Sequence, residues 1–251
     1  MEKINQLIQE WTRGTVQLST ELERKGYSKS LLQKYLRSRW LESLGYGAYK
    51  LAGDNVEWFG AISALQEQKN FSVHPGGKTA LEIKGYAHYL SEKYSNIQLY
   101  GIQSESLPRW FADQDWKVTV SYIQTKLFGD DTRKYLTDTE IKNVKIKVSS
   151  PEMASMEMLL LVPKGQSFDE AVKIMEGLTT LRPRLIQNLL EKCNSVKVKR
   201  LFLFMAEKIG HSWLKELDSA KINLGSGKRV VVQNGVLNKK YNITVPREYA
   251  E

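Results

Sequence analysis

The part of the sequence that most constrains the fold is residues 14–51, where short helical patterns and short strand-like runs follow one another in a fixed order. Ser19-Thr20 suits the cap of a first helix, which ends at Gly26, the residue type favoured just past a helix C-terminus. A second helix is predicted from about Lys29 to Ser38. Two helices separated by a single glycine-containing turn are therefore expected.

A hairpin is predicted directly after these helices. Its strands are expected at 40–44 and 48–51, and Gly45-Tyr46-Gly47 has the composition of a hairpin turn. Helix, turn, helix and hairpin is the order of a winged helix-turn-helix, a motif whose second helix enters a DNA groove. The sequence therefore predicts a DNA-reading module near the start of the chain.

The second helix has two different faces. Helical spacing places its apolar side chains on one side: Leu31, Leu32, Tyr35 and Leu36. The opposite side carries two cations that can bind phosphates and two groups that can hydrogen-bond base edges: Ser30, Gln33, Lys34 and Arg37. An ordinary solvated helix has a similar outer face, so the preceding turn and the following hairpin are what favour DNA binding. The predicted contact residues are Ser28, Lys29, Ser30, Gln33, Lys34 and Arg37, with Tyr46 and Lys50 in or beside the hairpin turn.

The positive charge of the chain is concentrated elsewhere. The 251 residues have a net charge of +9, yet residues 1–90 hold 12 Lys and Arg against 9 Asp and Glu, whereas residues 182–251 hold 14 against 6. A basic C-terminal quarter could add non-specific phosphate contacts or dock an acidic protein.

Beyond about residue 92 the pattern changes from helical to strand-like, which predicts two domains, 1–92 and 93–251. The expected strands of the second domain are 97–102, 117–124 and 141–148, followed near the C-terminus by 229–233 and 240–245 around Asn234-Gly235. Helices are expected between these groups, at 151–161, 168–178, 183–193, 196–209 and 212–217. The predicted fold class is thus α+β, with strands at both ends of the second domain and a helical middle.

Several features bear on the class of protein. Cys193 is the single cysteine, and the longest apolar run, 201–206, is far too short to cross a bilayer, so we expect a cytoplasmic protein without a membrane segment. His74, His88 and His211 lack metal-ligand spacing, and Gly77-Lys78-Thr79 lacks the earlier glycine of a phosphate-binding loop. No metal, cofactor or catalytic residue is predicted.

Two alternatives remain open. Glu140 and Lys142, near Asp130 and Asp131, have the residue types of a metal-dependent nuclease. A winged helix can also serve as a scaffold that binds protein instead of DNA. Convergence of the carboxylates on one cation would favour the nuclease.

The chain also resembles AbiEi-type antitoxins, the transcriptional regulators of type IV toxin–antitoxin systems. In residues 1–90 the resemblance rests on these segments: 28–39, Trp40-Leu41-Glu42 through Tyr49, 59–65, His74-Pro75-Gly76-Gly77-Lys78-Thr79-Ala80-Leu81 and 85–90. In the second domain it rests on Ser149-Ser150-Pro151-Glu152 with Ala154. The family often has an arginine after that glutamate, where this chain has Met153.

The resemblance implies a winged helix that binds inverted repeats in double-stranded operator DNA and represses its own operon. It also implies a C-terminal domain needed for antitoxicity, and a partner toxin of the AbiEii type that resembles a nucleotidyltransferase. It does not say whether the antitoxin contacts its toxin directly.

Overall fold

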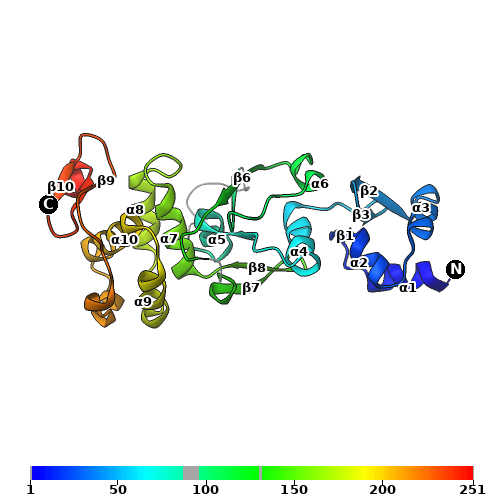
Figure 1. The fold of residues 1–251 in the computed structure, drawn as a ribbon, viewed down its shortest axis with the longest axis horizontal. Coiled ribbons are helices and arrows are strands. Elements are labelled where there is room, and N and C mark those ends of the chain that lie inside the picture. Colours follow the sequence, from blue (N-terminus) through cyan, green and yellow to red (C-terminus); the bar gives the residue numbers. More distant parts are fainter. Residues whose placement is uncertain (1, 87–95, 130–131, 251) are drawn as a thin grey trace.

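The computed structural model describes residues 2–86, 96–129 and 132–250. The described chain is elongated, and its two ends lie at opposite ends of the long axis (Figure 1). Along that axis the N-terminal helices and hairpin come first, then a central region of strands, then a group of helices and a small C-terminal sheet. The predicted class, mixed α+β, is confirmed at this level.

The N-terminal part contains three helices and a small sheet. The helices are α1 (Glu2–Glu10), α2 (Ser19–Arg24) and α3 (Lys29–Arg37). The strands are β1 (Gln17–Leu18), β2 (Leu41–Gly45) and β3 (Ala48–Leu51), arranged antiparallel in the order β1-β3-β2. The helix, turn, helix and hairpin predicted over residues 14–51 are therefore present, each within about a residue or two of its expected bounds.

The turn between α2 and α3 follows the sequence signals closely. Gly26 has φ +88°, the left-handed conformation that favours glycine, and the amide of Tyr27 donates to the Leu22 carbonyl at 2.9 Å. Ser28 caps α3, because its hydroxyl accepts a hydrogen bond from the Leu31 amide at 3.3 Å.

The predicted cap of the first helix is wrong. Leu18 occupies the N-cap position of α2, and no side chain caps this helix. Ser19 is instead the first helical residue, and its amide donates to the carbonyl of Gly47 at 2.8 Å. A carbonyl of the hairpin thus satisfies one amide at the start of this helix, and no hydroxyl caps it.

The central region of the molecule contains two sheets and the helices packed beside them. Helices α4 (Trp58–Gln68) and α5 (Gly77–Ile83) accompany a sheet of order β4-β5-β6, in which β5 and β6 are parallel. Its strands are β4 (His74–Pro75), β5 (Asn96–Gly101) and β6 (Thr119–Gln124), and a short helix, α6 (Arg109–Ala112), lies in the connection between β5 and β6. The second sheet is the hairpin β7 (Leu136–Ile141) and β8 (Val144–Ser149).

This hairpin corrects a prediction. Residues 141–148 were expected to form one strand, but the chain reverses at Lys142 and Asn143, which have φ +47° and φ +67°. Ile141 therefore ends β7 and Val144 begins β8. Two successive left-handed residues are what a tight two-residue hairpin turn requires.

The remaining helices are α7 (Pro151–Leu161), α8 (Phe168–Glu176), α9 (Pro183–Lys192) and α10 (Val196–Ile209), close to their predicted bounds. The segment predicted as a helix at 212–217 is a 3-10 helix, Ser212–Glu216, and further 3-10 turns lie at Arg133–Tyr135, Ser219–Lys221 and Arg247–Tyr249. Within the described residues, no helix is both long and apolar enough to cross a bilayer.

The C-terminal sheet also differs from the prediction. It has the order β10-β11-β9, with strands β9 (Arg229–Val230), β10 (Val236–Asn238) and β11 (Ile243–Val245). Two strands were expected to close around Asn234-Gly235. Instead, β11 pairs in parallel with β9, and the unpredicted strand β10 pairs antiparallel with β11.

The apolar core divides into two clusters. The smaller one lies within the N-terminal part and joins α1, α3 and the hairpin. The larger one contains residues of α4 and α5 together with the strands and helices that follow. The predicted boundary at residue 92 falls among residues 87–95, outside the described residues.

Helix α7 shows why the serine-proline-glutamate element occurs where it does. Ser150 caps the helix and Pro151 occupies its first turn, as predicted. Glu152 is buried and accepts hydrogen bonds from Nε, Nη2 and the amide of Arg182, each at 2.9 Å. The element therefore ties the start of α7 to the start of α9, while the neighbouring Met153 lies in the core.

Candidate nucleic-acid interface

Helix α3 presents the two faces that its sequence predicts. Leu32 and Tyr35 are buried in the N-terminal cluster, where they join Ile4, Leu7 and Trp11 from α1 and its end. On the opposite side Ser30, Gln33, Lys34 and Arg37 are all exposed. The apolar contact with α1 fixes the rotation of α3, so the polar face points to solvent.

The cations of this face are not engaged by the protein itself. Among the described residues, Lys29, Lys34 and Arg37 form no ion pair. Ser28 and Ser30 differ, because their hydroxyls lie 3.0 Å apart and the Ser28 oxygen also caps the helix. Three charges near the helix are therefore available to an anionic partner.

Tyr46 occupies the middle of the hairpin turn and is 100% exposed. Its neighbours on both sides are held: the Gly47 carbonyl accepts from the Ser19 amide, and the Ser43 hydroxyl donates to the Gly45 carbonyl at 2.9 Å. A fully exposed aromatic side chain on a fixed backbone is suited to contacts outside the protein.

Lys50 is placed differently from the other predicted contact residues. It is half-buried, and its ammonium group lies 2.9 Å from Oε2 of Glu42 and 2.8 Å from the carbonyl oxygen of Asp54. The hydrogen bond from Lys50, with another from the amide of Gly53, lowers the pKa of Glu42. The charge of Lys50 is thus already neutralised inside the hairpin.

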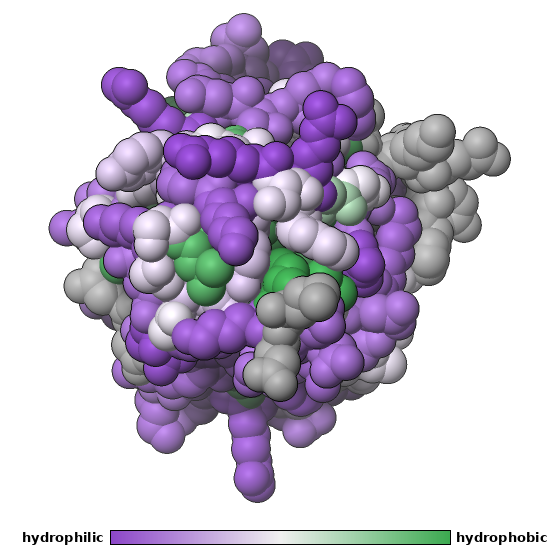
Figure 2. All heavy atoms as spheres, turned by 90° about the vertical axis from the view of Figure 1, so that its right-hand side faces the viewer, coloured by the Kyte–Doolittle hydropathy of each residue, from purple (hydrophilic) through white to green (hydrophobic). Residues whose placement is uncertain are grey.

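A groove of about 680 Å³ lies between α2, α3 and the hairpin. Lys29 and Gln33 line it from α3, and Tyr46 lines it from the turn. Figure 2 views this end of the molecule, whose surface is mostly hydrophilic with small apolar areas. The structure thus gathers predicted contact residues from two separate elements around one concave surface.

Two residues just past α3 were not predicted as contacts. Arg39 is exposed and has φ +57°, and Trp40 is 48% exposed although it is a large apolar residue. Both lie between the end of α3 and the start of β2. Exposure of an aromatic beside cations could not be read from helical spacing, because both residues lie beyond the helix.

The residues of the nuclease alternative do not converge in the described structure. Lys142 makes an ion pair with Glu57 of the segment before α4, at 2.6 Å. Glu140 is exposed on β7 and lies opposite Lys145. Asp130 and Asp131 lie outside the described residues, and the described part of the chain contains no group of three potential metal ligands.

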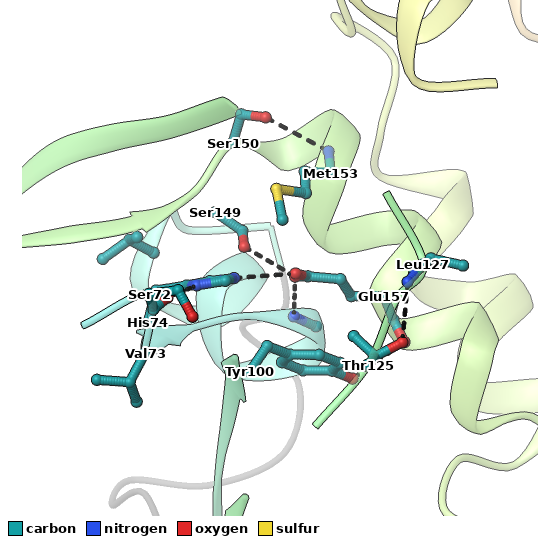
Figure 3. A network of polar contacts seen from close by, with 12 residues as sticks. Ser72, Val73, His74, Tyr100, Thr125, Leu127, Ser149, Ser150, Met153 and Glu157 are labelled. Carbon is teal, nitrogen blue, oxygen red and sulfur yellow. Dashed lines mark hydrogen bonds and ion pairs between the residues drawn. The ribbon is translucent and has the colours of Figure 1, made fainter. Parts of the chain in front are cut away.

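The glycine-rich segment before α5 holds an internal carboxylate (Figure 3). Glu157 of α7 is buried, and its Oε2 accepts from the amide of Gly77 at 3.0 Å and from the hydroxyl of Ser149 at 2.8 Å. Its Oε1 lies 3.0 Å from Nε2 of His74. The start of α5 is therefore occupied by a side chain of the protein, which gives Gly77-Lys78-Thr79 a structural role.

The sequence predictions do not include this buried network, although the sequence holds a signal for it. Glu157 stands between Met156 and Met158 in a helix that is apolar on nearly all sides. A carboxylate in such a helix needs buried hydrogen-bond partners.

Comparison with known proteins agrees with this architecture. The family model of the AbiEi antitoxin, described as a transcriptional regulator of a type IV toxin–antitoxin system, matches residues 94–246. The model of the N-terminal domain of AbiEi antitoxin transcriptional regulators matches residues 1–92. No curated protein matches the chain.

A solved structure shares the fold. The crystal structure of the RV2827C protein from Mycobacterium tuberculosis superimposes with a TM-score of 0.60 at 14% sequence identity. The match covers 96% of this chain and 88% of that one. Because the two family models together account for nearly the whole sequence, the predicted resemblance is confirmed: the chain belongs to the AbiEi family of antitoxins and transcriptional regulators of type IV toxin–antitoxin systems.

Proposed function

We propose that residues 1–51 form a winged helix-turn-helix that binds double-stranded operator DNA, with α3 in the major groove and the β2–β3 hairpin as the wing. The observation that carries this proposal is the polar face of α3. It combines cations that have no partner in the described structure with hydrogen-bonding side chains, and a buried apolar face fixes its direction.

The side chains of this face divide into two roles. Lys29, Lys34 and Arg37 contact phosphates and supply affinity that does not depend on sequence. Gln33 and Ser30 face base edges, and a glutamine can bind adenine through two hydrogen bonds. Ser28 serves first as the cap of α3.

The hairpin has its own division of labour. Tyr46 contacts the sugar-phosphate backbone or the minor groove, because it is fully exposed and lines the same groove as Gln33. Lys50 holds the hairpin together through Glu42 and does not contact DNA. The wing thus contributes one aromatic contact to DNA and no cation.

In the cell, we propose an autorepressor and antitoxin that binds inverted repeats in its own promoter in the cytoplasm. Residues 93–251 form the antitoxin domain, which counteracts a nucleotidyltransferase-like toxin of the AbiEii type. Membership of the family supports this proposal. No residue of the chain is assigned a catalytic role.

The basic C-terminal quarter does not assist α3 at the same site. Figure 1 places the C-terminal sheet and α3 at opposite ends of the elongated molecule. Electrostatic contacts weaken beyond a Debye length of about 8 Å at physiological salt. Operator affinity of the N-terminal part must therefore come mainly from its own cations.

The test of sequence reading is Gln33→Ala. Binding is measured by fluorescence anisotropy with the promoter fragment upstream of the gene and with an unrelated duplex of equal length. Loss of a base contact should weaken promoter binding by about ten- to a hundredfold and leave binding to the unrelated duplex unchanged. Lys192→Ala, an exposed change on α9 far from α3, is the control. Equal weakening on both duplexes would show that Gln33 does not read bases.

A further inference from the structure

The hairpin turn that carries Tyr46 is fixed from two sides. On one side the amide of Ser19, the first residue of α2, donates to the Gly47 carbonyl at 2.8 Å. On the other side strand β2 of the hairpin contacts α6, which lies more than 60 residues further along the sequence. The backbone is held while the side chain between these contacts is fully exposed.

The contact with α6 is close and specific. The side-chain amide of Gln114, just after α6, donates to the Leu44 carbonyl at 2.8 Å. Gly45 has φ +142°, and a Cβ built on it would lie 2.8 Å from Cβ of Trp110. No side chain separates the turn from Trp110, so the hairpin backbone rests directly on α6.

Helix α6 is itself rigidly supported. Trp110, Phe111 and Trp116 are all buried, and the rings of Phe111 and Trp116 lie 5.1 Å apart. Nε1 of Trp116 donates to the carbonyl of Phe111 at 2.8 Å. These aromatic residues belong to the larger core cluster, whereas α3 rests on the smaller one.

The hairpin and α3 share the smaller cluster, and the turn has in α6 an additional support from another part of the molecule. Helix α6 lies in the β5–β6 connection, within residues 94–246, which the AbiEi antitoxin family model matches. In Figure 1 it extends from the central sheet toward β2. A change in the second domain that moves α6 would therefore act on the turn directly, through the contact with β2.

From this geometry we propose that Trp110 and Gln114 are positioning residues for Tyr46: the second domain sets the position of the wing on DNA through α6. The inference rests on the proposed DNA binding. Holding the turn in one position removes the cost of ordering it on binding, which is how preorganisation increases affinity. The strength of the Tyr46 contact then depends on two residues that touch no DNA.

The support that α6 gives to the hairpin turn can be tested without DNA, by a spin label placed on the turn. In Tyr46→Cys the introduced thiol can be labelled selectively, because the native Cys193 is buried. Gln114→Ala in this background should increase label mobility, and so should Gln114→Glu, which keeps the size of the side chain but has no donor for Leu44. The control is Gln187→Ala, which removes hydrogen bonds of a similar kind near the C-terminal half of the chain. Spectra that stay unchanged in both Gln114 variants would overturn the proposal.

The consequence for binding is tested by a double-mutant cycle on the promoter fragment. Tyr46→Ala and Gln114→Ala should each weaken binding, the latter by about two- to tenfold, the range that one hydrogen bond supplies. In the Tyr46→Ala background, Gln114→Ala should have no further effect. Effects that multiply would show that Gln114 does not act through Tyr46. A wild-type protein that fails to bind the promoter would instead refute the proposed function. The spin-label experiment would still show whether α6 holds the hairpin turn in position.

Discussion

Replacing Glu157 with alanine should destabilise the protein by about 3–5 kcal/mol, because it leaves several buried polar groups without their hydrogen-bond acceptor. Glu157 is 1% exposed and His74 is 2% exposed, so water cannot replace the lost contacts. The change leaves the Gly77 amide, the Ser149 hydroxyl and the His74 ring without their partner. Three hydrogen bonds at about 1–1.5 kcal/mol each give a total in the same range.

Glu157→Gln is the matched comparison, and the hydrogen bonds of His74 determine its effect. Nδ1 of His74 lies 2.6 Å from the Ser72 carbonyl, which can only accept, so Nδ1 carries a proton. With Nδ1 as the donor, Nε2 can accept from the amide of a glutamine at position 157. The glutamine oxygen can still accept from Gly77 and Ser149. The Gln variant should therefore lose only about 1 kcal/mol.

The two variants are compared by urea and thermal unfolding at neutral pH. In a chain of this size about 1 kcal/mol corresponds to 2–4 °C, so the Ala variant should melt about 10 °C below the wild type and the Gln variant within a few degrees of it. Equal losses in both variants would refute the idea that hydrogen bonding, and not only the volume of the side chain, holds α5 and α7 together.

Three further outcomes follow from the contacts described above. Burial raises the pKa of Glu152, but the hydrogen bonds from Arg182 outweigh this effect and hold the pKa below its usual value. The stabilisation that the Glu152–Arg182 pair gives to the folded protein is therefore present at neutral pH and is lost as the pH falls through the lowered pKa. Because the Arg182 side chain is 60% exposed, Arg182→Ala should cost only about 1 kcal/mol in unfolding at pH 7 and almost nothing in strong acid. Burial raises the pKa of Cys193 to about 11, so iodoacetamide at pH 8 should modify the native protein far more slowly than the urea-unfolded chain. Gly60→Ala should destabilise by at least about 1–3 kcal/mol in thermal unfolding, because the new Cβ would lie 1.9 Å from the Gly14 carbonyl oxygen; wild-type stability would contradict this close approach.

Local patterns predicted the elements whose causes are local. Gly26 ends α2, Ser28 caps α3, and Ser150 with Pro151 starts α7, each because a residue type fits a backbone position. The outward face of α3 was predictable for the same reason, since helical spacing fixes which side chains share a side. The family resemblance added what spacing cannot supply, the link to a toxin–antitoxin system.

What the sequence did not predict depends on turns without a strong signal or on distant contacts. The reversal at Lys142 and Asn143 has no glycine, so residues 141–148 were predicted as one strand and β7 was not predicted. The position of Ser19 as the first helical residue depends on its hydrogen bond to Gly47, and the support of the hairpin by α6 depends on Trp110 and Gln114. These partners are distant in the sequence.

Lys50 lies between these cases. Its partner Glu42 is directly opposite it in the hairpin register, so their pairing follows once the register is known. From the sequence alone its charge looked available to DNA. The register of the hairpin, and not the residue type, decides whether Lys50 is available to contact DNA.

The central claim, that α3 is the DNA-reading helix, is tested most directly by the salt dependence of promoter binding for Lys34→Ala and Arg37→Ala. Both side chains are exposed and form no ion pair in the described structure, so unfolding free energies should change by less than about 0.5 kcal/mol. Each variant should bind the promoter more weakly, and its logarithmic salt slope should fall by about one, as expected when one phosphate contact is lost. Lys192→Ala should change neither quantity. Unchanged affinity and slope in both α3 variants would contradict the assignment of this helix to DNA.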